Sequence, residues 1–350
     1  MEKKYELTSD IRLAGRGVWL HRIKALVDIY NDEGEKVVRA GSFGGWIESE
    51  ENLSQEGSCW VAYEARVYGN ARVSGSALIA DCAEVFDHAR VSDKAKVKDY
   101  AKVYGNAKVS GEATVSGHAE IYDSAKIVDG TVRDNAKVFG NAAIYYRAKV
   151  AGDAQMFEGA IACHLAEICE HARIHGRARI FGKSLCCERV DICDNAQVSG
   201  RVGGDVRIYG SATVRGEVWR EAEIYGEALI DPDVVIDGAV KVFDHARILN
   251  RAKVNGLAYI HDDAVVCGNA RVNGKRYRYT EEGVFKDATI SDFSDKLGIE
   301  IFGKAQVNDN ANIIDNARIS GNVAIGGTAI IGGNIILAGN EEYNQGYICD

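Results

Sequence analysis

A six-residue repeat runs through most of this chain and limits the folds that it can adopt. Between Ala65 and Glu112 the consecutive units are ARVYGN, ARVSGS, ALIADC, AEVFDH, ARVSDK, AKVKDY, AKVYGN and AKVSGE. Each unit places alanine two positions before an aliphatic residue and usually a glycine or an aspartate two positions after it. Self-similarity at a short fixed period is the signature of stacked structural units, so the repeat predicts a solenoid.

The pattern within each unit predicts a short β-strand followed by a corner. Alternate residues of a strand share a side, so the alanine and the aliphatic residue face inward while their neighbours face outward. Glycine, aspartate and asparagine tolerate the positive φ angles that a tight corner requires. Three units then close one triangular coil of 18 residues. We therefore predict an all-β fold, a single-stranded parallel β-helix.

Composition sets the broad class of protein. Of the 350 residues, 27% are charged and 46% are hydrophobic, which is typical of a folded protein without a membrane span. The first residues, MEKKYELTSD, lack the apolar stretch of a secretory signal, and nine scattered cysteines fit a reducing compartment, so we expect a cytoplasmic location. The net charge of −9 argues against a dedicated nucleic-acid binder.

The repeat also divides the chain. Residues 1–62 lack it and read as a β-rich N-terminal cap, because the first coil of a solenoid otherwise exposes an unpaired strand edge. The β-helix is predicted over residues 63–340, interrupted by a loop insertion at 275–298. Residues 341–350 are expected to form a C-terminal tail.

Two outward columns follow from sorting the repeat by coil, because residues 18 apart stack on one face. The first is aromatic, and stacked rings stabilise themselves as well as offering an interface to a partner or subunit. The second carries four like charges beside three serines, and it either holds an anionic ligand or spreads its charges into water. The aromatic column is Tyr68, Phe86, Tyr104, Tyr122, Phe139 and Phe157; the second contains Arg72, Arg90, Lys108 and Lys126 with Ser74, Ser92 and Ser110.

Catalytic candidates are few. Most histidines fall at corner positions where other units carry asparagine, which indicates a structural role. His261 faces outward next to Asp262 and Asp263, which makes it the candidate general base if the protein is an enzyme. The cysteines show no metal-binding spacing, so no metal site and no cofactor are predicted.

The repeat units resemble the hexapeptide repeat of left-handed β-helix proteins. The segment GGWIESEENLSQEGSCWV, from Gly44 to Val61, resembles the YdcK-like branch that is met in bacterial and phage genomes. The resemblance covers essentially the whole chain and implies a left-handed coil. Many hexapeptide-repeat proteins are trimeric acyltransferases that use acyl-coenzyme A, and the YdcK-like branch carries an acyltransferase label without an agreed catalytic residue. This label is a fold-level analogy.

Two functions therefore stand. The first is a non-enzymatic scaffold or binding protein, which uses its outward columns and the 275–298 loop to bind a partner or a small anionic ligand. The alternative is a trimeric acyltransferase with its site between subunits and acyl-coenzyme A as donor. We favour the first, because no convergent polar site is visible in the sequence.

Overall fold

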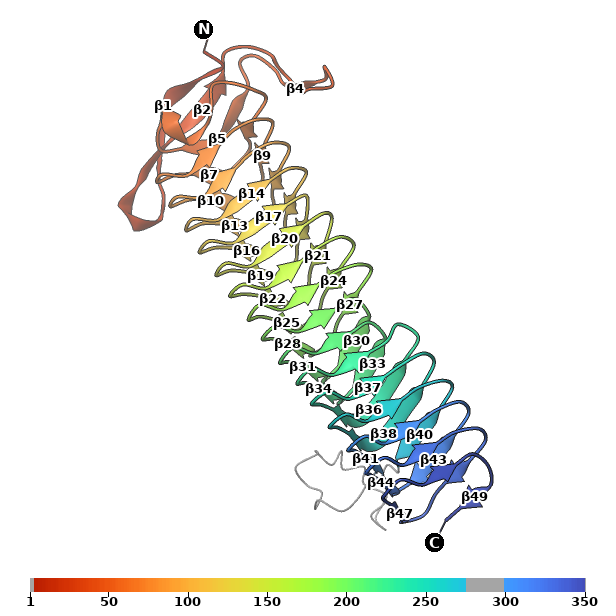
Figure 1. Ribbon diagram of the computed structural model, residues 1–350. Coiled ribbons are helices and arrows are strands. Elements are labelled where there is room, and N and C mark those ends of the chain that lie inside the picture. Colours follow the sequence, from red (N-terminus) through yellow and green to blue (C-terminus); the bar gives the residue numbers. More distant parts are fainter. Residues whose placement is uncertain (1–2, 275–298, 350) are drawn as a thin grey trace, which may run out of the picture. The chain divides into compact units, whose positions relative to one another are not determined.

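Short parallel strands, most of them two or three residues long, build nearly all of the structure (Figure 1). The computed structural model describes residues 3–274 and 299–349. It is an all-β solenoid of stacked coils, which confirms the predicted fold class. The chain divides into two compact units, Met1–Lys183 and Ser184–Asp350, and each is described by itself.

Each coil of the first unit contributes one strand to each of three faces. The first face consists of β5 (Phe43–Ile47), β7 (Arg66–Val67), β10 (Glu84–Val85), β13 (Lys102–Val103), β16 (Glu120–Ile121), β19 (Lys137–Val138), β22 (Gln155–Met156) and β25 (Arg173–Ile174). The second face consists of β8 (Arg72–Val73), β11 (Arg90–Val91), β14 (Lys108–Ser110), β17 (Lys126–Val128), β20 (Ala143–Tyr145), β23 (Ile161–Ala162) and β26 (Arg179–Ile180). The third face consists of β6 (Trp60–Val61), β9 (Leu78–Ile79), β12 (Lys96–Val97), β15 (Thr114–Val115), β18 (Thr131–Val132), β21 (Lys149–Val150) and β24 (Glu167–Ile168).

The second unit repeats this arrangement. Its first face consists of β28 (Asp191–Ile192), β31 (Arg207–Ile208), β34 (Glu223–Ile224), β36 (Val235–Val242), β38 (Lys253–Ile260), β41 (Ile299–Ile301), β44 (Arg318–Ile319) and β47 (Ile336–Leu337). Its second face consists of β29 (Gln197–Val198), β32 (Thr213–Val214), β35 (Leu229–Ile230), β37 (Arg247–Ile248), β39 (Val265–Val266), β42 (Gln306–Val307), β45 (Ala324–Ile325) and β48 (Glu342–Tyr343). The third face consists of β27 (Leu185–Cys186), β30 (Arg201–Gly204), β33 (Glu217–Arg220), parts of β36 and β38, β40 (Arg271–Gly274), β43 (Asn312–Asp315), β46 (Ile330–Ile331) and β49 (Tyr347–Ile348).

The core of each unit is the interior of its coils. The predicted inward pairs are fully buried, as Ala65 with Val67 and Ala101 with Val103 illustrate. Because one side chain of each pair is small, successive layers fill the interior without larger residues. The same pattern of buried alanines with valine or isoleucine continues in the second unit, for example at Ala246 and Ile248.

The corners use aspartate for a second reason besides its tolerance of positive φ. Asp99 has a φ of 61°, and its Oδ2 accepts the Gly117 backbone N–H of the next coil at 2.9 Å. Asp309 does the same in the second unit, where its Oδ2 accepts the Gly327 N–H at 3.0 Å. A corner aspartate therefore provides a partner for a backbone donor one coil further on. The same bond is made by Asp81, Asp87, Asp93, Asp123, Asp134, Asp194, Asp244, Asp262 and Asp315.

Two coils at the start of the second unit are shorter than the others. Leu185 pairs with Arg201 and Arg201 pairs with Glu217, so these coils contain 16 residues instead of 18. The chain then crosses from one face to the next without a normal corner. Gly200 permits this close approach, because a Cβ at this position would lie 1.9 Å from the Gly216 carbonyl oxygen.

The N-terminal segment contains β1 (Tyr5–Leu13), the 3-10 turn η1 (Gly15–Gly17), β2 (Trp19–Ala25), β3 (Ile29–Tyr30), β4 (Lys36–Val38) and η2 (Glu50–Asn52). Strands β1 and β2 pair antiparallel, β2 pairs with β5, and β5 pairs in parallel with β7. The buried Lys4 ammonium donates to the Cys59 carbonyl oxygen at 3.1 Å, and burial lowers the pKa of Lys4. These contacts join the segment to the first coils.

Candidate functional site

A column of four basic side chains lies on the second face of the first unit. Arg72, Arg90, Lys108 and Lys126 begin β8, β11, β14 and β17, and the strand register pairs each with the next. All four are exposed. The structure thus brings the four predicted cations into one file, with about 4.8 Å between neighbouring strands. The file ends at Ala143 of β20, which pairs with the last cation.

The two ends of this basic column have partners. Arg72 Nη2 lies 3.6 Å from Glu51 Oε2, and the Lys126 ammonium lies 5.6 Å from the centre of the Tyr145 ring. In the described part of the chain, no ion pair holds the two middle cations. Neighbouring like charges repel, so the middle of the column carries positive charge that the protein itself does not neutralise.

The three predicted serines lie beside the basic column, just after the inward aliphatic residue of each strand. Ser74 is exposed, and Ser92 and Ser110 are half-buried. The Ser92 hydroxyl donates to Asp93 Oδ2 at 3.3 Å, and the same oxygen accepts the Gly111 N–H. This hydroxyl is therefore directed toward a corner carboxylate, so the cations are the stronger part of the predicted binding surface.

The first face of the same unit carries a column of alternating charge at the equivalent position. Arg66 Nη1 lies 3.7 Å from Glu84 Oε1, and Lys137 Nζ lies 3.6 Å from Glu120 Oε1. Each cation thus has an anion in a neighbouring coil. The two faces have the same strand geometry and differ in charge order, so the fold does not impose the like charges of the basic column.

Stacked rings form the predicted aromatic ladder on this first face. Neighbouring ring centroids are 4.7 to 5.1 Å apart, and the ring planes differ by 2 to 6°. Tyr68 is only 8% exposed, because Ala14, Leu20 and Trp46 of the N-terminal segment pack around it. The other rings are half-buried. In order, the ladder is Tyr68, Phe86, Tyr104, Tyr122, Phe139, Phe157 and His175.

The ring faces within the ladder are covered by neighbouring rings. The hydroxyl of Tyr68 donates to Glu84 Oε2 at 3.0 Å, and that of Tyr104 donates to Glu120 Oε2 at 3.2 Å. Burial, followed by the Glu120 charge, raises the pKa of Tyr104 above its usual value. A partner on this face would meet ring edges and engaged hydroxyls, which supports the self-stacking role of the ladder.

A second ladder, which the sequence analysis did not identify, lies on the first face of the second unit. Tyr209, Tyr225, Phe243, His261 and Phe302 stack with centroid distances of 4.6 to 5.2 Å. Burial is the main cause that raises the pKa of Tyr225 to about 12. The repeat spacing conceals this ladder, because one shortened coil and the 275–298 insertion interrupt the count of 18.

The candidate base His261 is enclosed within this second ladder. Its Nε2 lies 3.4 Å from Glu300 Oε1 and its Nδ1 lies 3.4 Å from Asp262 Oδ1, and the side chain is 17% exposed. Asp263, the other predicted neighbour, lies 3.9 Å from Nδ1 of His245 instead. A general base must reach the proton of its substrate, and here each ring nitrogen of His261 faces a carboxylate.

One further group of side chains was missed by sequence reasoning. Asp244, His261 and Asp262 each place a ligand atom within 4.8 Å of the others. The available signal was two acidic corners in consecutive coils beside a histidine at the ladder position. The sequence analysis tested the cysteines for metal-binding spacing and did not apply this criterion.

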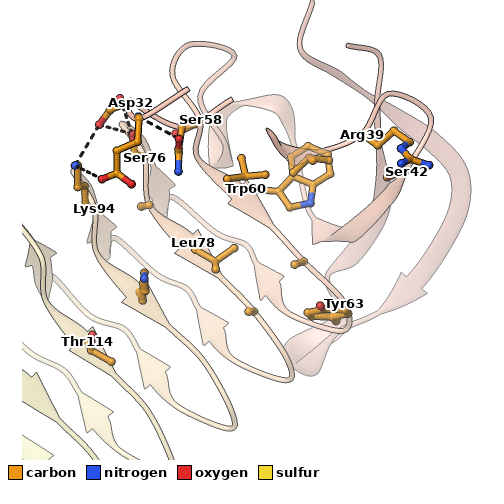
Figure 2. Close-up of a pocket in the computed structure, with 18 of the residues that line it drawn as sticks. Asp32, Arg39, Ser42, Ser58, Trp60, Tyr63, Ser76, Leu78, Lys94 and Thr114 are labelled. Atoms are coloured by element: carbon orange, nitrogen blue, oxygen red, sulfur yellow. Dashed lines mark hydrogen bonds and ion pairs between the residues drawn. The ribbon is translucent and has the colours of Figure 1, made fainter. Parts of the chain in front are cut away.

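A groove of about 880 Å³ lies between the β3–β4 hairpin and the third face of the first unit (Figure 2). Trp60, which is 5% exposed, and Leu78 line it, and Figure 2 shows Asp32 of the hairpin joined to Ser76 and Lys94. The volume suits a small molecule. Its charges balance, so the groove selects neither sign; they are Arg39, Lys94 and Lys96 against Asp32, Glu33 and Glu112.

Two other expectations have limited structural information. Among the described residues, no helix has the length and apolar character to cross a bilayer. The predicted loop insertion at 275–298 lies outside the described residues.

Comparison with known families gives one match. The family described as the YdcK Beta solenoid repeat matches residues 65–79, which form β7, β8 and β9 with their corners. No curated protein matches the chain. The matched segment includes Arg72 and Ser74 of the basic column and Tyr68 of the first ladder. The match therefore concerns the coil itself and assigns no activity.

Proposed function

Since the chain is a YdcK-like β-helix protein, we propose that it is a non-enzymatic binding protein that holds an anionic ligand along its basic column. The ligand is a linear or branched anion with several charges, because a single charge would not use a file of four cations. The column is a local feature of a chain whose net charge is −9. Binding is therefore expected to depend on this face and not on overall charge.

The observation that carries the proposal is the difference between two faces of one unit. On the first face, Arg66 and Lys137 each have a glutamate in a neighbouring coil. On the second face, Arg90 and Lys108 have cations above and below them. Like charges directly opposite each other are destabilising by a few tenths of a kcal/mol, roughly. An anionic ligand would turn this repulsion into attraction, whereas the fold alone gains nothing from it.

The proposal is tested with inorganic polyphosphate as probe, by calorimetric titration at several salt concentrations. The double variant Arg90→Gln with Lys108→Gln removes two charges from the centre of the basic column. We expect its affinity to fall roughly tenfold or more at low salt, with a shallower dependence on salt, because fewer counterions are exchanged on binding.

The matched control removes two charges from the alternating column. Lys102→Gln with Lys137→Gln changes the net charge equally on the first face, so it is expected to keep most of the affinity. Equal losses in both double variants would show that only net charge matters and would overturn the proposal. Absence of saturable binding by the wild-type protein would also overturn it.

The acyltransferase alternative is examined in the same preparation. Solution mass reports the oligomeric state, and incubation with acetyl-coenzyme A and a set of amine and hydroxyl acceptors reports turnover. A trimer with turnover that is lost in His261→Ala would replace the binding proposal by the alternative. Turnover that persists in this variant would leave an enzyme without its named base. A protein that binds polyphosphate through Arg90 and Lys108 without turnover supports the proposal.

A further inference from the structure

The corner next to the second ladder gathers three potential metal ligands in the second unit. Asp244 follows β36, and His261 and Asp262 follow β38 one coil further on. One ligand atom from each residue lies within 4.8 Å of the other two. A carboxylate oxygen and an imidazole nitrogen suit borderline divalent ions such as Zn²⁺.

The His261 ring is held in a fixed orientation. Phe243 stacks on one side at 4.6 Å and Phe302 on the other at 5.2 Å between ring centroids. Glu300 Oε1 lies 3.4 Å from Nε2, and the Arg318 guanidinium holds the same carboxylate at 2.6 Å. When Nε2 carries the proton and donates to Glu300, Nδ1 presents its lone pair on the side of the two aspartates. A carboxylate on the far nitrogen is the usual support of a metal-binding histidine.

The two aspartates are also held in place, and each keeps one oxygen beyond its corner bond. Asp244 Oδ2 accepts the Asp262 N–H at 3.4 Å, and Asp262 Oδ2 accepts the Gly303 N–H at 3.1 Å. Asp262 Oδ1 is the atom 3.4 Å from His261 Nδ1. Two nearby carboxylates repel each other unless a cation lies between them. A divalent ion would provide that cation.

The histidine of the first ladder provides an internal comparison. His175 Nδ1 lies 3.9 Å from Glu158 Oε2, but the next corner in this file is Gly176, which has no side chain. The first unit thus pairs its ladder histidine with an acid from one corner, whereas the second unit has acids at two consecutive corners. The additional acid distinguishes the two positions chemically.

We propose that Asp244, His261 Nδ1 and Asp262 bind a divalent transition-metal ion of the Zn²⁺ class, with Glu300 as the positioning residue for the histidine. Three protein ligands leave further coordination positions open to water or to another ligand. The site is independent of the basic column, which lies in the first unit, so either proposal can fail without the other.

The proposal is tested with Co²⁺ as a spectroscopic probe of the zinc-type site, in the full-length protein. Visible absorption and calorimetry are expected to show saturable binding of one equivalent without a thiolate-to-cobalt charge-transfer band, because the ligands are nitrogen and oxygen. His261→Phe continues the ring stack, so the fold is retained, and is expected to weaken binding roughly a hundredfold. Asp262→Asn, which keeps an oxygen acceptor for the Gly303 N–H, is expected to weaken it roughly tenfold.

Matched variants decide the outcome. His175→Phe makes the same change in the first ladder and is expected to leave Co²⁺ affinity unchanged, whereas Glu300→Gln is expected to weaken it severalfold through the ring orientation. Equal affinity in the wild-type protein and His261→Phe would overturn the proposal. A thiolate charge-transfer band would overturn it as well, because it would assign the ion to cysteines. Circular dichroism checks that each variant is folded.

Discussion

The ladders of the two units occupy the same face of the same type of coil, yet their surroundings differ. In the first unit, six phenylalanine and tyrosine rings precede His175, and the adjoining corners alternate between glycine and acid. In the second unit, His261 lies between two phenylalanines, and the adjoining corners at Asp244 and Asp262 are both acidic. Rings and corner acids both have structural roles, so the order in which they recur decides whether their polar atoms converge.

The largest expected effect comes from interrupting the first ladder. Phe86→Ser with Tyr104→Ser removes three stacked ring pairs, each worth about 0.5 to 1.5 kcal/mol, so we expect the free energy of unfolding to fall by about 1.5 to 4.5 kcal/mol. Tyr225→Ser in the second ladder removes two pairs and should cost about 1 to 3 kcal/mol. Urea unfolding followed by circular dichroism measures both.

The control for these ladder variants is Leu165→Ser, which replaces an exposed apolar side chain of the first unit outside the ladder. It should change stability by less than about 0.5 kcal/mol. If the double ladder variant is no less stable than this control, the rings are present for another reason, and the interface role predicted from sequence becomes the better explanation.

A smaller effect is expected at the corners, and it should be equal in the two units. Asp99→Ala and Asp309→Ala each place a Cβ residue without a polar group at positive φ and remove a bond to a backbone N–H. We expect losses of about 1 to 3 kcal/mol from strain and from the lost charge-assisted bond. Thermal unfolding of Asp99→Gly, which removes only the bond, separates the two terms. Unchanged stability in all three variants would refute the corner role of aspartate.

The sequence predicts the coil because its local and long-range patterns agree. Ala65 and Val67 are assigned to the interior by strand alternation alone, and the ring at Phe86 is placed above Tyr104 by counting 18 residues. Asp99 is placed at a corner by its tolerance of positive φ. Its bond to Gly117 depends on the coil above, so the sequence predicts the conformation and not the partner.

Features that depend on irregular spacing are not predicted. Tyr209 and Tyr225 stack although they are separated by one of the shortened coils, and His261 meets Phe302 across the 275–298 insertion. The contact of Asp32 with Lys94 forms one side of the groove, and it depends on where a hairpin outside the repeat folds back. No period in the sequence specifies these contacts, so the groove and the acidic corner beside His261 require the structure.

The comparison of the two ladder histidines is sharpened by stability measurements. Without added metal and in the presence of a chelator, His175→Phe and His261→Phe should each change the free energy of unfolding by less than about 1 kcal/mol, because a ring still fills the stack. Added Zn²⁺ should raise the melting temperature of the wild-type protein and of His175→Phe, since binding to the folded state alone stabilises it. A rise of the same size in His261→Phe would remove the distinction between the two units.

The smallest effect concerns the tyrosine hydroxyls of the second ladder at high pH. Burial, with the charges of Tyr209 and Glu223, raises the pKa of Tyr225 to about 12, whereas an unfolded tyrosine titrates near about 10. The unfolded state therefore loses this proton first, and the stabilisation is complete below about pH 10 and is lost as the pH approaches 12. The melting temperature of the wild-type protein should fall more steeply over this window than that of Tyr225→Phe, which has no proton to lose. Parallel curves would show that the hydroxyl is no harder to ionise in the fold, and the ladder would then be a stack of rings whose polar edges remain fully hydrated.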